Sequence, residues 1–188
     1  MHPDSSHLSM QALSLADIRY SWDRDQHYLL DGIIEMDEAY LGVSKHGKKR
    51  GRSTDQRKIA VMVSKNNAGL PKFVYLQNIP DIKTATLQNV VNCHVAPGTT
   101  LECDGYKSYP GLKNVRVNPS KYITGDLKWA HVAIGNFKAF LLGTYHGSCG
   151  NIQPYLDEFC FRFNRRFQPR QLFSRLSRAV ATPYALLP

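Results

Sequence analysis

The sequence lacks any apolar run of the about 18 residues that a membrane-spanning helix needs. Residues 1–14 are polar and contain no apolar core of a signal peptide. The four cysteines form no C-x-x-C pair, and no histidine spacing completes a zinc finger. A glycine-rich phosphate loop of the Walker type is also missing, which argues against nucleotide hydrolysis. These absences indicate a globular protein without a membrane partner, for which we expect a cytoplasmic location.

Positive charge is what the sequence has in excess. It contains 24 Lys and Arg residues against 15 Asp and Glu residues, a formal net charge of +9. Such a surplus favours polyanionic partners, because lysine and arginine release counterions when they neutralise a phosphate backbone. We therefore expect double-stranded DNA as a partner; the alternative is an ordinary basic surface. The length of 188 residues suits one domain with a sizeable core.

The predicted elements follow an α/β order. Strand candidates at 58–64 and 72–76 flank turn-forming residues that favour a hairpin, and an earlier strand is predicted at 32–37. We expect these three strands to be antiparallel. The elements predicted after them are a helix at 84–95, strands at 99–103 and 114–117, and helices at 129–142 and 151–166. This order predicts a mixed sheet with helices on its faces.

Two aspartates end predicted strands. Asp37 closes the strand at 32–37, and Asp104 follows the strand at 99–103. If these strands are neighbours in the sheet, the two carboxylates converge at one edge, where they can hold Mg²⁺ or Mn²⁺, which prefer oxygen ligands. Two such ions can activate a water or a 3′-hydroxyl and stabilise the leaving oxygen of a phosphodiester. Taken singly, each aspartate has the alternative role of a solvated residue at a strand end.

Three glutamates lie close to these aspartates in the sequence. Strand alternation places Glu35 on the face of Asp37, and Glu102 on the face of Asp104. Together with Glu38, they are candidates for supporting a metal site, or they are ordinary polar positions.

Three segments resemble bacterial insertion-sequence transposases of the ISXO type. Residues 35–42 (EMDEAYLG) are similar to the motif around the first acid of this family, and residues 95–109 (VAPGTTLECDGYKSY) to the segment that holds its second acid. Residues 143–146 (GTYH) and 155–166 (YLDEFCFRFNRR) resemble its C-terminal signature. The resemblance extends over residues 29–167.

This resemblance implies a ribonuclease-H-like fold of the DDE superfamily. It also implies metal-dependent cleavage and strand transfer of DNA during transposition, a site for two Mg²⁺ or Mn²⁺ ions, and a homo-oligomer in the active complex. The catalytic domain is then expected at 31–168, followed by a C-terminal tail at 169–188. A helical lead-in at 1–30 is interpreted as the remnant of a lost N-terminal region that bound DNA.

The resemblance further implies a third metal-site residue, commonly Glu, on the helix at 129–142, with a Lys seven positions later. Counting back from Gly143, which is expected to end this helix, places Lys138 at the lysine and His131 at the acid. Seven residues turn a helix by about 700°, so His131 and Lys138 share a face. Asn136, about 140° away from His131, is the alternative third residue. An imidazole can bind Mn²⁺ or assist proton transfer but suits Mg²⁺ less than a carboxylate does.

Basic side chains near the expected site are predicted to contact DNA phosphates, which positions the substrate without reading its sequence. Lys138 is one of them. A loop after the first acid and the last helix contribute the others: Lys45, Lys48, Lys49, Arg50, Arg52, Arg162, Arg165 and Arg166. The three arginines have the alternative of pairing with Asp157 and Glu158.

Three other functions stay open from the sequence. A catalytically inactive remnant would bind DNA without cutting it, and a metal-dependent nuclease would hydrolyse DNA without joining strands. A small hydrolase or structural module of another class would not bind DNA at moderate salt.

Overall fold

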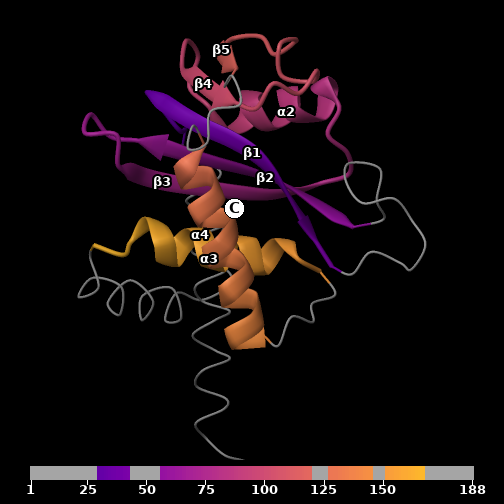
Figure 1. Ribbon diagram of the computed structural model, residues 1–188, viewed down its shortest axis with the longest axis vertical. Helices are drawn as coiled ribbons and strands as arrows, with labels where there is room; N and C mark the ends of the chain where they lie inside the picture. The colour runs from indigo at the N-terminus through magenta and orange to yellow at the C-terminus, as the bar shows by residue number, and fades with distance from the viewer. Residues whose placement is uncertain (1–28, 43–55, 120–126, 146–150, 168–188) are drawn as a thin grey trace, which may run out of the picture.

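The computed structural model describes residues 29–42, 56–119, 127–145 and 151–167 (Figure 1). Its elements are β1 (Ile33–Leu41), β2 (Arg57–Lys65), β3 (Pro71–Ile79), α2 (Thr84–His94), β4 (Thr100–Cys103), β5 (Arg116–Pro119), α3 (Lys128–Tyr145) and α4 (Gln153–Asn164). The expected tail at 169–188, and all but the last two residues of the expected lead-in at 1–30, lie outside the described residues.

The five strands form one mixed sheet in the order β3-β2-β1-β4-β5. The β1–β2 and β2–β3 pairs are antiparallel, whereas the β1–β4 and β4–β5 pairs are parallel. Three antiparallel strands come first along the chain, and parallel strands are then added beside β1. This arrangement confirms the predicted ribonuclease-H-like fold.

Strand β2, which lies between β3 and β1, is buried on both faces. Alternate side chains point to opposite sides of a strand, so Ile59, Val61 and Val63 pack with α3 and α4, while Ala60 and Met62 pack in the cluster that contains α2. Figure 1 shows α2 on one side of the sheet, with α3 and α4 on the other. Burial on both sides explains why β2 is a nearly continuous apolar run.

Strand β1 carries its acidic residues on both faces of the sheet. Met36 belongs to the cluster around α2, and Ala39 belongs to the cluster around α3 and α4. Alternation therefore places Glu35 and Asp37 on the α3 face, and Glu38 on the opposite face.

Among the predicted boundaries that differ from the structure, two concern elements of the candidate site. Asp37 does not end its strand, because β1 pairs with β2 as far as Leu41 opposite Arg57. Likewise, Gly143 does not end α3, which continues to Tyr145. A glycine lowers helix propensity by about 1 kcal/mol, which is too little to stop a helix by itself.

Helix α4 covers the outer edge of the sheet at β3. The side-chain amide of Asn164 accepts a hydrogen bond from the Val74 backbone nitrogen (2.7 Å) and donates one to the Val74 carbonyl (2.9 Å). Gln153 accepts from the backbone nitrogen of Asn78 (2.8 Å) and donates to the Leu76 carbonyl (3.3 Å). Two side chains of one helix thus satisfy backbone groups along a strand that has a neighbour on one side only.

Candidate metal site

Asp37 and Asp104 lie next to each other at the point where β4 ends. The last paired residues of the parallel strands β1 and β4 are Met36 and Cys103, so each aspartate directly follows a paired residue, Asp37 within β1 and Asp104 after the end of β4. Asp37, Glu38 and Asp104 each offer a carboxylate oxygen, and these oxygens all lie within 4.8 Å of one another. The structure thus brings both predicted aspartates together and adds Glu38 to them.

Backbone contacts hold one oxygen of each aspartate. Oδ1 of Asp37 accepts a hydrogen bond from the backbone nitrogen of Glu38 (2.8 Å). Oδ1 of Asp104 accepts one from the backbone nitrogen of Tyr106 (3.0 Å), which closes a turn directly after β4. Each aspartate thus has one oxygen held by a backbone N–H group that is close to it in the sequence.

Negative charge accumulates at this edge of the sheet. Burial raises the pKa of the Cys103 thiol to about 12, and the charges of Asp104, Glu38 and Asp37 add to the effect. Burial also raises the pKa of Tyr109 well above its usual value, again with help from Glu38, Asp37 and Asp104. Two carboxylates at this spacing repel each other by about 3 kcal/mol at an effective dielectric constant near 20. The cluster is therefore a place where a cation relieves repulsion.

His131 reaches this cluster from α3. Its Nε2 lies 3.1 Å from Oδ2 of Asp37, and its side chain is 66% exposed, against 15% for Asp37. Asn136 and Lys138 are both exposed on α3. Within the described parts of the chain, neither of these two side chains forms a hydrogen bond or an ion pair. Of the two residues considered for the third position, His131 contacts Asp37, whereas no contact of Asn136 with the carboxylates is found in the described residues.

Glu35 contacts the same helix at Trp129 and Ala130, the two residues immediately before His131. Its side chain is buried, at 2% exposure, and Oε2 accepts hydrogen bonds from the backbone nitrogens of Trp129 (2.7 Å) and Ala130 (2.9 Å). Lys65 lies 3.4 Å from Oε1 of Glu35 and also pairs with Glu102. Sequence reasoning identified Glu35 and Glu102 only as candidates for support of the metal site. The signal in the sequence that Glu35 makes a structural contact was its place in an apolar run, because an acid buried among apolar residues needs a partner.

The model of the ISXO2-like transposase domain family matches residues 29–164. The chain belongs to this family. A comparison with curated proteins gives no match. No helix in the described ranges has the length and apolarity to cross a bilayer.

Several solved structures are similar to this transposase domain at low identity. The catalytic core domain of BIV integrase aligns at 13% identity with a TM-score of 0.49, over 72% of this chain and 85% of that chain. The catalytic domain of Mos1 mariner transposase aligns at 13% identity with a TM-score of 0.35, over 96% of this chain and 95% of that chain. In the Mos1 strand transfer complex the match has 13% identity and a TM-score of 0.38, over 96% of this chain and 62% of that chain.

The arginines of the C-terminal signature make contacts inside the transposase domain. Arg162 Nη2 lies 2.7 Å from Oε1 of the buried Glu158. Arg165 is 5% exposed and its guanidinium stacks over the Phe161 ring. Arg166 donates hydrogen bonds to the carbonyls of residues 71 and 72, next to the start of β3. The basic residues expected in the loop after the first acid (Lys45, Lys48, Lys49, Arg50 and Arg52) lie outside the described residues.

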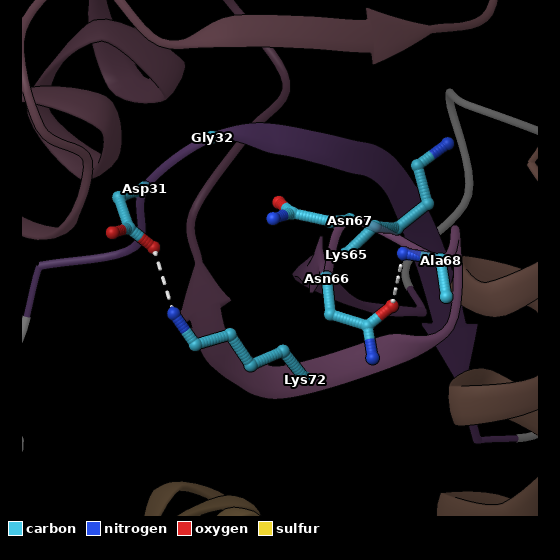
Figure 2. A pocket seen from close by; sticks show the side chains of 7 residues that line it. All are labelled: Asp31, Gly32, Lys65, Asn66, Asn67, Ala68 and Lys72. Carbon is cyan, nitrogen blue, oxygen red and sulfur yellow. Dashed lines mark hydrogen bonds and ion pairs between the residues drawn. The ribbon is translucent and has the colours of Figure 1, made fainter.

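A depression of about 480 Å³ lies at the other end of β1 and the β2–β3 turn. Figure 2 shows its lining residues: Asp31, Gly32, Lys65, Asn66, Asn67, Ala68 and Lys72. Lys72 and Asp31 form an ion pair of 3.4 Å across it. None of the three clustered carboxylates lines this depression, so it is separate from the candidate metal site.

Proposed function

We propose that this domain catalyses metal-dependent cleavage of DNA strands and strand transfer in the transposition of an insertion sequence. The observation that carries the proposal is the register of β1 and β4, which juxtaposes Asp37 and Asp104 within a transposase-family domain. Glu38 supplies a third carboxylate within 4.8 Å. The family's chemistry needs acidic ligands at one place, and the sheet provides them there.

The chemistry of these side chains fits Mg²⁺ or Mn²⁺. Three carboxylates offer only oxygen ligands, which both ions accept, and their mutual repulsion disfavours the site without a cation. Asp37, Asp104 and Glu38 would hold the ions, with His131 as a nitrogen ligand that suits Mn²⁺ better than Mg²⁺. Bound ions of this kind supply activation of a water or 3′-hydroxyl and stabilisation of the leaving oxygen.

His131 has two further roles that its position allows. Nε2 orients the Asp37 carboxylate through their 3.1 Å contact. Because most of the imidazole is exposed, it also lies where it can exchange a proton with a bound substrate. Asn136 remains the alternative third residue, to be separated from His131 by substitution.

DNA is the proposed substrate, bound as element ends and target by a homo-oligomer. The net charge of +9 supports a phosphate backbone as the partner. Lys138 supports it more locally: it is exposed on α3, on the same face as His131 and about two turns further along. Contacts from Lys45, Lys48, Lys49, Arg50 and Arg52 are part of the proposal. Contacts from Arg162, Arg165 and Arg166 would require guanidinium groups that already bond within the domain.

The test is cleavage and joining of a duplex taken from the DNA that flanks the gene, with Mg²⁺ or Mn²⁺. Asp37→Asn and Asp104→Asn should each abolish product, and Glu38→Gln should lower the affinity for Mn²⁺ measured by calorimetry. Asp31→Asn is the control, since it removes an exposed acid outside the cluster. Cleavage that persists in both aspartate variants would overturn the mechanism; cleavage without joined product would identify a nuclease.

One observation favours a second candidate, a DNA-binding remnant without catalysis. The α3 residue that contacts Asp37 is a histidine, in the position where the family resemblance implies an acid. A remnant would bind duplex DNA with steep salt dependence. It would yield no cleaved product with either metal ion, which separates the two candidates in the same assay.

A further inference from the structure

The start of α3 receives its negatively charged partner from a strand far away in the sequence. The first four backbone N–H groups of an α-helix have no acceptor within the helix, and this end carries a partial positive charge. The first turn of α3 contains no acidic residue. Glu35 of β1 fills this role, because one carboxylate oxygen accepts from both Trp129 (2.7 Å) and Ala130 (2.9 Å).

A second contact between the same two elements lies directly beside the first. Asp37 is two residues after Glu35 and on the same face of β1. His131 follows Ala130 in α3, and its Nε2 lies 3.1 Å from Asp37. Glu35 therefore fixes the helix backbone immediately before the residue that reaches the carboxylate cluster.

Lys65 contacts the oxygen of the Glu35 carboxylate that does not face α3. Its ammonium lies 3.4 Å from Oε1 of Glu35 and also pairs with Glu102 of β4. Burial opposes the charge on Lys65, but the bonds and the charges of Glu102 and Glu35 outweigh it, and its pKa is raised. Oε1 thus faces the lysine while Oε2 faces the helix, so both oxygens of a buried carboxylate have partners.

We propose that Glu35 is a positioning residue, which holds the first turn of α3 against β1 and thereby keeps His131 against Asp37. The role given to His131 rests on the proposed function, whereas the placement of α3 does not. Glu35 is not a metal ligand in this proposal, because its oxygens are turned to Lys65 and to the helix. Its effect on the site passes through two backbone N–H groups.

The experiment measures whether His131 senses Asp37 in the full chain, without DNA and without metal. The His131 ring resonance is identified by its absence from His131→Gln. Asp37→Asn should shift this resonance in the wild type. In a Glu35→Ala background the same substitution should leave it almost unshifted. In Glu35→Gln the shift should be restored, because an amide oxygen can still accept from Trp129 and Ala130.

Glu102→Gln is the matched control. It removes the other carboxylate partner of Lys65 and leaves the contact between Glu35 and α3 intact, so the shift should persist. Two results would overturn the proposal. One is a folded Glu35→Ala protein in which the shift is unchanged, and the other is an equal loss of the shift in Glu102→Gln.

Amide hydrogen exchange of the wild type covers the case in which Glu35→Ala does not fold. The amides of Trp129 and Ala130 should exchange at least about tenfold more slowly, after correction for intrinsic rates, than those of Ala85 and Thr86. The latter residues occupy the first turn of α2, which has no side-chain cap. Equal exchange at the two helix starts would contradict the proposal. Because neither measurement involves cleavage, failure of the proposed function would leave both results interpretable.

Discussion

Asp37 and His131 lie side by side where β1 meets α3, with Oδ2 of the aspartate 3.1 Å from Nε2 of the histidine. Two acids of the candidate site come from the middle of β1 and the third from the residue after β4, while the helix contributes an imidazole. A glutamate at position 131 would bring a fourth carboxylate to the same place. This relationship makes position 131 the most informative one to change.

Replacing His131 by glutamate should increase the affinity for Mg²⁺. The substitution adds an oxygen ligand beside Asp37, and it should also lower stability without metal, because a fourth negative charge joins the cluster. A tenfold gain in affinity corresponds to about 1.4 kcal/mol of added stabilisation at saturating Mg²⁺. The measurement is the change in Tm on adding Mg²⁺, compared between variant and wild type.

Asn136→Glu is the control for this substitution. Position 136 lies about 140° around the helix from His131, so a carboxylate there is directed away from Asp37. Its Mg²⁺-induced change in Tm should match that of the wild type. If Asn136→Glu gains Mg²⁺ affinity and His131→Glu does not, position 136 is the third site residue.

Replacing Asn164 by alanine should destabilise the domain by about 1–3 kcal/mol. The change removes both hydrogen bonds to Val74 and leaves backbone groups of β3 without these partners. Urea unfolding measures the loss. Asn92→Ala is the matched control, since Asn92 is exposed on α2 and accepts a hydrogen bond from the half-buried Gln88 of the same helix. Equal stabilities of the two variants would show that the Asn164 contacts contribute nothing.

The stability of the domain should fall as the pH drops from about 6.5 towards 4 because of His94. Burial lowers the pKa of His94 from 6.5 to about 4, and its Nε2 lies 2.8 Å from the Tyr75 hydroxyl. In this window the unfolded chain takes up a proton that the folded histidine does not. The free energy of unfolding therefore decreases with falling pH, by at most about 1.4 kcal/mol per pH unit from this group.

Urea unfolding at pH 7 and pH 5 tests this dependence on wild type and His94→Gln. The variant should have a lower stability at pH 7 but a smaller loss between the two pH values. An identical loss in both proteins would assign the pH dependence to other groups.

The sequence was sufficient to predict the mixed sheet and the convergence of the Asp37 and Asp104 carboxylates. Apolar strands that lead to an acid can be recognised from local sequence patterns, and the motifs around each aspartate resemble those of a known family. The extension of β1 beyond Asp37 was not predictable in the same way. It depends on β2 remaining paired with β1 after β4 has ended opposite Met36.

The role of Glu35 illustrates what local patterns cannot contain. Its hydrogen-bond donors lie 94 and 95 residues away, and they become neighbours only after α3 has packed on the sheet. The arginines of the C-terminal signature also have contacts that local sequence patterns do not reveal. Arg165 and Arg166 looked like DNA contacts because of their charge, whereas their surroundings, an aromatic ring and backbone carbonyls, come from tertiary packing.

The amide side chains of α4 restrict how copies of this domain can associate. A second molecule that extended the sheet at β3 would have to displace Asn164 and Gln153 from the backbone groups of Val74, Leu76 and Asn78. Self-association by β-augmentation is therefore disfavoured at β3, and a second molecule would associate through the other edge strand, β5, or through side-chain surfaces. Asn164, which belongs to the C-terminal signature, thus occupies backbone groups of β3 that another strand would otherwise pair with.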